Sequence, residues 1–234
     1  MSGDEPPIRP ASTLILVRGQ GEVLLLLRSA GHGFLANMWV FPGGRVDQVD
    51  GPDERGARRA AVRETWEEAG ILLGEEARSA APGEAREGVT FETEPWPMVS
   101  FARWVTPRGE RRRYDTRFYL ARVPHVEAAP DLGEVTQARW LTPAAALEQH
   151  RVNALPMAPP TFWSLEALRR LETVEAMLAW AREQERRGFG PIETTLAFEQ
   201  GAMIVATDRE SLPLPAGESV SGRLRLVRGV WHMA

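Results

Sequence analysis

Three glutamates stand close together in VRETWEEAG, residues 62–70. On a helix, Glu64, Glu67 and Glu68 are spaced i, i+3 and i+4, so their carboxylates share one face within a single turn. Carboxylates at this density repel one another unless a cation lies between them. Hard oxygen ligands of this kind suit Mg²⁺ or Mn²⁺. A solvated acidic face is the commoner reason for a bare ExxEE pattern, so the flanking residues must decide between the two interpretations.

The flanking residues resemble a known motif. The stretch 44–72 resembles the Nudix box, G-x(5)-E-x(7)-R-E-U-x-E-E-x-G-U, in which U is aliphatic. Residues 63–71 align with the second half without a gap, and Thr65 takes the first aliphatic slot. The first half differs from the motif in two ways. Asp50 stands where the motif has glutamate, and twelve residues rather than seven separate it from Arg63. Glu54 is the alternative occupant of this acidic slot.

The resemblance implies a fold, an activity and a metal. The expected fold is the α+β Nudix fold, a mixed β-sheet between α-helices, here followed by a C-terminal helix and a β-rich extension. The expected activity is hydrolysis of a nucleoside diphosphate linked to another group. Glu64, Glu67 and Glu68 carry over as catalytic ligands of Mg²⁺ or Mn²⁺, and Gly44 as a backbone carbonyl near the metal. This agrees with the chemistry, because cations neutralise pyrophosphate oxygens and activate the attacking water.

Two further residues have expected roles. The resemblance implies that Arg63 is structural and braces the helix against Asp50 or Glu54. Many Nudix mechanisms also need a general base, whose position varies among branches. Glu134, in the loop before an expected strand at 138–142, is the candidate because loops at strand ends commonly carry such residues.

The likeness extends beyond the box. LLLLRSAGHGFLANMWVFPGGRVD, RETWEEAGILL, RRYDTRFYLAR and ARWLTPAAAL are similar in order and spacing to a branch that includes the peroxisomal acyl-coenzyme A diphosphatases and their bacterial relatives. The likeness covers roughly residues 8–170. It implies coenzyme A or acyl-coenzyme A as substrate. The alternative substrate is ADP-ribose, NADH or another nucleotide. A third hypothesis is that the protein is a catalytically inactive nucleotide sensor.

Several residues could contact such a substrate. Arg28 and Arg45 lie near the loop that should face it. Trp39 could stack on a base, although packing in the core is the commoner role of such a residue. The run Arg111, Arg112 and Arg113 could bind a phosphate by bidentate contacts, but its position in an expected hairpin turn favours a solvated role.

Composition limits the remaining possibilities. The net charge of −4 argues against a protein that coats nucleic acid. A small nucleotide substrate is the partner that the resemblance implies. The chain contains no lysine, which excludes Schiff-base chemistry, and any anion held by side-chain charge must be held by arginine. The absence of cysteine, of a signal-like start and of a long apolar run predicts a cytoplasmic protein that does not enter a membrane.

The elements that must position these residues can be predicted from periodicity and turn signals. We expect two β-hairpins, a charged helix capped by Gly70, a helix that begins at Thr142 and Pro143, and one long helix after PPT. The leucine stripe of that long helix predicts a core or a dimer seam. We expect a Nudix domain at 1–187 and a β-rich extension at 188–234, packed on the same domain or at the interface of a homodimer.

Overall fold

A computed structural model gives the structure of the chain and describes residues 6–31, 35–74, 76–80, 97–130, 132–207, 212 and 222–234. The strands of the main domain are β1 (Ile8–Arg18), β2 (Glu22–Arg28), β3 (Trp39–Val40), β4 (Gly43–Arg45), β5 (Ile71–Leu73), β6 (Ala77–Ser79), β7 (Val99–Val105), β8 (Arg113–Arg122) and β9 (Val135–Leu141). The helices are α1 (Glu54–Ala69), α2 (Pro143–Arg151), α3 (Pro159–Leu168) and α4 (Val174–Arg187). The strands β10 (Ile192–Glu199), β11 (Ala202–Thr207), β12 (Arg223–Val227) and β13 (Val230–Met233) follow.

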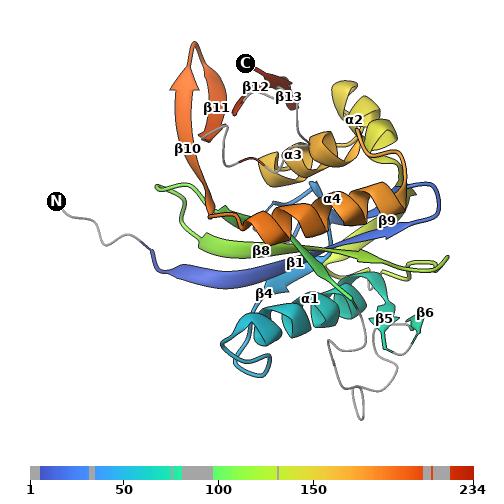
Figure 1. Cartoon of the computed structure of the whole chain (residues 1–234). Helices are drawn as coiled ribbons and strands as arrows, with labels where there is room; N and C mark the ends of the chain where they lie inside the picture. Colours follow the sequence, from blue (N-terminus) through green and yellow to red (C-terminus); the bar gives the residue numbers. More distant parts are fainter. Residues whose placement is uncertain are drawn as a thin grey trace.

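One mixed sheet organises the molecule (Figure 1). Its described strands run in the order β13-β12-β11-β10-β7-β8-β1-β2-β3, with β4 beside β1 and β9 beside β2, while β5 and β6 form a separate pair. The pairing of β1 with β8 is parallel, whereas β1 with β2 and β7 with β8 are antiparallel. The two expected hairpins and the mixed sheet are therefore confirmed.

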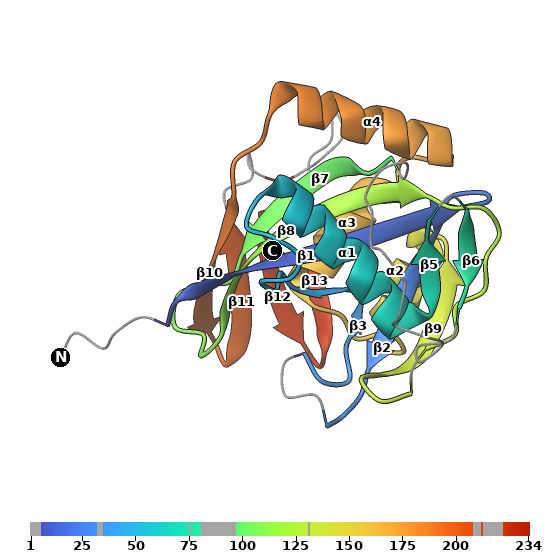
Figure 2. The ribbon, with the colours of Figure 1, turned by 90° about the horizontal axis from the view of Figure 1, so that it is seen from below.

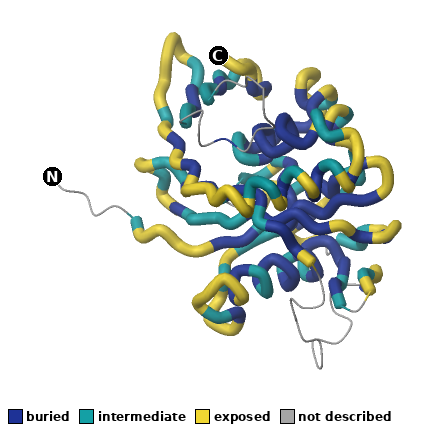
Figure 3. The backbone as a smooth tube through the Cα atoms, in the orientation of Figure 1, coloured by how far each residue is buried: buried dark blue, intermediate teal, exposed yellow. Residues whose placement is uncertain are grey.

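Strand β1 separates two hydrophobic cores because successive side chains of a strand point to opposite faces. Leu14 and Leu16 belong to the core beneath α1, whereas Ile15 and Val17 belong to the core that contains α3 and α4. Figure 2 shows α1 lying across β1 and β8. Figure 3 shows that burial is concentrated along these strands and the helix surfaces that face them.

The single long helix expected after PPT is wrong. The structure has two helices, α3 and α4, because Thr173 starts the second one by accepting a hydrogen bond from the amide of Ala176. The leucine stripe arises from the inner faces of both helices, since Leu165, Leu168 and Leu178 are all buried in the same core.

The strands after α4 extend the main sheet. Ile192 and Glu193 of β10 pair in parallel with β7. The backbone amide of Trp231 in β13 donates to Nε2 of His150 at 2.9 Å, and its indole Nε1 donates to the carbonyl of Met157 at 2.8 Å. Nδ1 of the fully buried His150 lies 2.9 Å from the carbonyl of Leu155, so this neutral ring joins α2 to the last strand. Burial lowers the pKa of His150, which keeps Nε2 available as an acceptor.

The helices in the described part of the chain are too short or too polar to span a lipid bilayer.

Candidate active site

Helix α1 carries the acidic cluster and is held at both ends. Oδ1 of Asp53 accepts from the amide of Gly56 at 2.9 Å and caps its first turn. Gly70 ends the helix with φ 61° and ψ 28°, which confirms the expected glycine cap. The hydroxyl of the buried Ser12 donates to the carbonyl of Ala57 at 2.6 Å, so β1 fixes the position of the helix against the sheet.

Arg63 connects the helix to the loop before it. Its Nε and Nη2 donate to Oδ1 and Oδ2 of Asp50 at 3.1 and 2.8 Å, and Nη2 also donates to the carbonyl of Arg45 at 3.0 Å. Its Nη1 donates to Oε1 of Glu64 and Oε2 of Glu67, both at 2.9 Å. One guanidinium therefore orders two of the three clustered carboxylates while it holds the loop.

Of the two acids that the sequence offered to Arg63, Asp50 makes the contact. Asp50 is 4% exposed. Glu54 instead accepts from the hydroxyl of Tyr119 at 2.7 Å and lies 2.9 Å from Nη1 of Arg117. The role of Arg63 as a brace stays a prediction that mutation can test.

Glu68 is the most buried of the three glutamates. Its Oε1 accepts from Nη1 of Arg28 at 3.1 Å, and its Oε2 accepts from the amide of Gly43 at 2.9 Å. Nη2 of Arg28 also lies 3.9 Å from Oε2 of Glu134, whose side chain is 56% exposed. The carboxylate of Glu68 on α1 thus contacts Arg28 of β2 and Gly43 of β4, and Arg28 also lies near Glu134, which precedes β9.

Burial makes the charged forms of two glutamates unfavourable. Burial raises the pKa of Glu64 to about 7, despite the nearby guanidinium of Arg63 and with a further rise from Glu67. Burial raises the pKa of Glu68 to about 8, although Arg28 and the Gly43 amide favour its ionised form. In the absence of a further cation, loss of hydration therefore disfavours the charged forms of Glu64 and Glu68 more than the two arginines and the amide favour them.

Gly44 lies directly against this cluster. A Cβ atom at this position would lie 2.4 Å from Cδ of Glu64 and 2.5 and 2.6 Å from its two carboxylate oxygens. The carboxylate of Glu64 can take its observed position only because residue 44 has no side chain.

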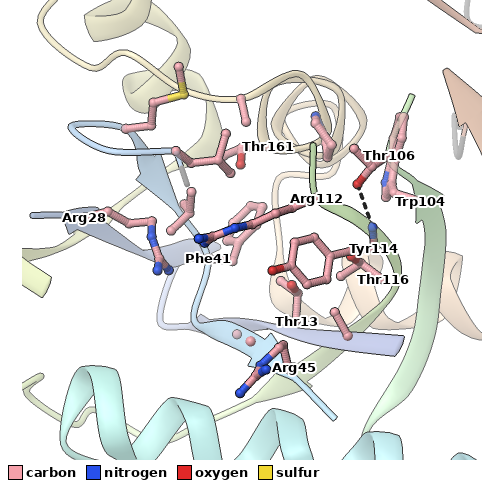
Figure 4. Close-up of a pocket in the computed structure, with 18 of the residues that line it drawn as sticks. Thr13, Arg28, Phe41, Arg45, Trp104, Thr106, Arg112, Tyr114, Thr116 and Thr161 are labelled. Carbon is pink, nitrogen blue, oxygen red and sulfur yellow. Dashed lines mark hydrogen bonds between the residues drawn. The ribbon is translucent and has the colours of Figure 1, made fainter. Parts of the chain in front are cut away.

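A cavity of about 1570 Å³ opens beside the cluster. Glu64, Glu67, Glu68 and Glu134 line it, together with Arg28, Arg45 and Gly44. In Figure 4, α1 lies on one side of the cavity near Arg45, and Thr161 at the start of α3 lies on the other. Arg112 reaches across the space toward Phe41, with the ring of Tyr114 beside it. The cavity thus brings acidic, basic and apolar side chains to one space.

Trp39 is not part of this wall among the described residues, so its assignment as a substrate contact is wrong. Its indole is 3% exposed in the core and lies beneath the guanidinium of Arg139, 4.9 Å from the ring centroid. The adjacent Met38 and Val40 line the cavity, and alternation along β3 turns Trp39 away from it.

The structure also adds residues to the site. Arg111 and Arg112 line the cavity, whereas the run's third member, Arg113, is buried and donates from Nε to the carbonyl of Thr106 at 3.2 Å. Arg111 and Arg112 are exposed, as expected for a solvated turn, and their place on the cavity also leaves a phosphate contact open. Gly43 was missed as a donor to Glu68, although FPGG was already visible in the sequence. No local signal pointed to Tyr114, which reaches the cavity through the pairing of β8 with β1.

Within the described residues, no three acidic or histidine side chains are grouped so that they could hold a metal ion as they stand. The carboxylates of Glu64 and Glu67 both face Nη1 of Arg63, and Glu68 faces Arg28.

Comparison with known proteins assigns this architecture to a family. The model of the NUDIX domain matches residues 7–161. The chain is 27% identical over 228 residues to the acyl-coenzyme A diphosphatase NUDT19 of Gallus gallus, covering 62% of this chain and 60% of that protein. It is 31% identical over 153 residues to the RNA pyrophosphohydrolase of Roseobacter denitrificans, covering 62% of this chain and 83% of that protein.

A solved structure agrees with this. A NUDIX hydrolase from Alicyclobacillus acidocaldarius matches with a TM-score of 0.62 and 25% identity, covering 74% of this chain and 96% of that one. The chain belongs to the NUDIX family. It spans about 60% of the length of the chicken diphosphatase, and the family match ends before α4 and the four strands that follow it.

Proposed function

We propose that this protein is a Mg²⁺- or Mn²⁺-dependent diphosphatase that hydrolyses the diphosphate linkage of coenzyme A or acyl-coenzyme A. The observation that carries the proposal is the carboxylate cluster of Glu64, Glu67 and the buried Glu68 beside a cavity lined by arginines. Acidic and basic groups on one cavity suit an anionic substrate that is bound together with cations.

The cluster fits a hard divalent cation in its donor chemistry. All three side chains offer carboxylate oxygens, which Mg²⁺ and Mn²⁺ prefer. The raised pKa values of Glu64 and Glu68 mark a site where added positive charge would be favourable. Glu64, Glu67 and Glu68 would hold the ion, with the Gly44 carbonyl beside them. When bound, the ion would neutralise phosphate oxygens and make a water molecule more nucleophilic.

The protein's own groups would bind the substrate and move the proton. Arg28 and Arg45 would hold the diphosphate oxygens, since both side chains line the cavity near the cluster. Arg63 would keep the glutamates oriented through its contacts with Asp50. Glu134, which is half exposed at the same end of the cavity, would accept the proton of the attacking water.

The choice of coenzyme A is supported by similarity to the chicken acyl-coenzyme A diphosphatase. Arg111 and Arg112 offer cations for a phosphate apart from the diphosphate. The likeness to an RNA pyrophosphohydrolase supports a second candidate, a pyrophosphatase of another substrate such as an RNA 5′ end. ADP-ribose and NADH belong to the same second class.

Incubation with Mg²⁺ and a substrate panel tests the proposal. The panel contains coenzyme A, lauroyl-coenzyme A, ADP-ribose, NADH and a 5′-triphosphorylated RNA oligomer. Release of 3′,5′-ADP with 4′-phosphopantetheine or its acyl form is the expected result. Cleavage confined to the other substrates would replace the first candidate by the second, and binding without any product would indicate a sensor.

A homodimer and a cytoplasmic location stay predictions, as does a domain division at residue 188. Sedimentation velocity of the purified chain would show whether it forms a homodimer.

A further inference from the structure

The strands β10–β13 present one continuous apolar face. Leu196 of β10 lies opposite Val205 of β11, and Val205 lies opposite Leu224 of β12. Leu226 of β12 lies opposite Trp231 of β13. Since opposite residues share a face and the side-chain period along a strand is two, all five project from the same side of the sheet.

Part of this face lines the cavity described above. Thr194, Leu196, Met203, Val205 and Trp231 belong to the cavity wall. No charged side chain is among the contributions that the described residues of these strands make to it. The hydroxyl of Thr194 donates to the carbonyl of Val105 at 3.4 Å, so this proton is not available to a ligand. This wall therefore offers contact area and few hydrogen bonds.

The wall is anchored to the family-matched part of the chain. Ile192 pairs with Trp104, and Trp104 stacks on Trp163 with ring centroids 5.3 Å apart. Trp231 is held at the other end of the wall by hydrogen bonds to His150 and Met157. A wall fixed at both ends can discriminate between ligand shapes.

We propose that strands β10, β11 and β13 form a binding wall for an apolar acyl chain carried by the diphosphate substrate. This inference rests on the proposed function, because it assigns the acyl end of the substrate to the apolar side of the same cavity. The acidic helix α1 would hold the diphosphate, and Leu196, Met203 and Trp231 would exclude water from the chain.

Two properties favour an acyl chain over a second nucleobase. A base needs several fixed donors and acceptors, whereas the wall supplies Leu196, Met203, Val205 and the ring of Trp231, whose Nε1–H already donates to Met157. The cavity, at about 1570 Å³, also exceeds the roughly 300–1,000 Å³ of common ligand sites. It has room for a group beyond the nucleotide.

The test compares lauroyl-coenzyme A with free coenzyme A. Leu196→Gln and Met203→Gln place a neutral polar group on the wall without adding charge that would repel phosphate. Ala197→Gln is the matched control, because Ala197 is the exposed neighbour of Leu196 on β10 and is not part of the cavity wall. Thermal unfolding confirms that each variant is folded.

We expect the ratio of kcat/KM for lauroyl-coenzyme A to that for coenzyme A to fall about tenfold in both wall variants, which corresponds to one or two buried methylene contacts. Ala197→Gln should keep the wild-type ratio. An unchanged ratio in folded wall variants, or an equal fall for both substrates, would overturn the inference.

Calorimetric binding separates this inference from the proposed function. One possible outcome is that the wild type turns over neither substrate but binds lauroyl-coenzyme A more tightly than coenzyme A. If Leu196→Gln then removes that preference, the proposed hydrolysis is wrong, whereas the acyl-binding role of the wall is supported. Equal affinity of the wild type for the two ligands overturns the wall, whatever turnover shows.

Discussion

The two sides of the cavity are built in contrasting ways. On one side, α1 presents carboxylates held by a network of arginines and backbone groups, and this side lies inside the NUDIX match. On the other side, β10, β11 and β13 present aliphatic and aromatic side chains from residues outside that match. The charged side suits chemistry at phosphorus, whereas the apolar side suits selection of the group attached to it.

The two sides differ in how exactly their side chains must be positioned. Electrostatic contacts depend steeply on position, so the acidic side uses bonds such as that from Gly43 to Glu68 to fix single atoms. Apolar contacts depend on area, so the opposite side needs a shaped surface and anchors at its ends. Mutations on the acidic side should change rate or stability sharply, and those on the apolar side should change substrate preference.

The largest expected effect is the loss of kcat when a carboxylate of α1 is removed. Glu67→Gln should lower kcat by at least about 10²–10³-fold, or about 3–4 kcal/mol, because one carboxylate ligand is lost. The melting temperature should change little, since Glu67 is partly exposed, at 29% of its side chain. Steady-state kinetics with Mg²⁺ measures the effect. The exposed Glu148→Gln on α2 is the control, and comparable activity in Glu67→Gln would remove the metal assignment.

The next effect concerns the stability of the acidic side. Asp50→Asn should lower the free energy of unfolding by about 3 kcal/mol, because the buried Arg63 loses its bidentate partner. Urea denaturation measures it. Asp47→Asn is the matched control, since its carboxylate is 48% exposed and lies 3.9 Å from Nη2 of Arg63. Equal stability of the two variants would argue against Arg63 as a brace.

A smaller loss of rate is expected from a single methyl group. Gly44→Ala should push the carboxylate of Glu64 aside, since the new Cβ would lie 2.4 Å from its Cδ. Misplacing a catalytic group by about 1 Å can cost about 10²-fold, so we expect a fall in kcat of about 10–10² with little change in melting temperature. Gly74→Ala, with nothing within 4 Å, is the control. A wild-type kcat in Gly44→Ala would show that the position of Glu64 is not critical.

The smallest effect is a pH dependence of stability in metal-free protein. Burial raises the pKa of Glu64 from 4.5 to about 7 and that of Glu68 from 4.5 to about 8, so the folded chain binds more protons than the unfolded chain in this range. The stability that these protons provide is complete below about pH 4.5 and is lost as pH rises through 7 to 8.

Melting temperatures with a chelator measure this pH dependence. Wild type should lose a few degrees relative to Glu64→Gln between pH 5 and 8, since 1 kcal/mol shifts the melting temperature of such a domain by about 2–4 °C. Added Mg²⁺ should restore the wild type. A constant difference between the two proteins across this range would contradict the raised pKa of Glu64.

The sequence predicted the acidic side better than the apolar side, for a physical reason. Helical spacing alone places Glu64, Glu67 and Glu68 on one face, and Gly70 signals the helix end. The contact of Arg28 with Glu68 spans 40 positions, so no local pattern reveals it. The contribution of Trp231 was equally hidden, because it depends on how β13 packs against α2 and on a buried histidine.

Two errors have the same origin. Trp39 was expected at the substrate because its type suits stacking, but strand alternation turns it into the core. The long helix was expected from leucine spacing, but two helices packed on one core give the same spacing, and Thr173 starts the second. Residue type and period report a preference, whereas tertiary packing decides which face is used.

Calorimetric titration of Mn²⁺ into metal-free protein tests whether the carboxylates of α1 hold a divalent cation. We expect saturable uptake by the wild type that is lost or strongly weakened in Glu64→Gln and Glu67→Gln but kept in Glu148→Gln. Absence of uptake by the folded wild type, both alone and with coenzyme A present, would contradict this expectation.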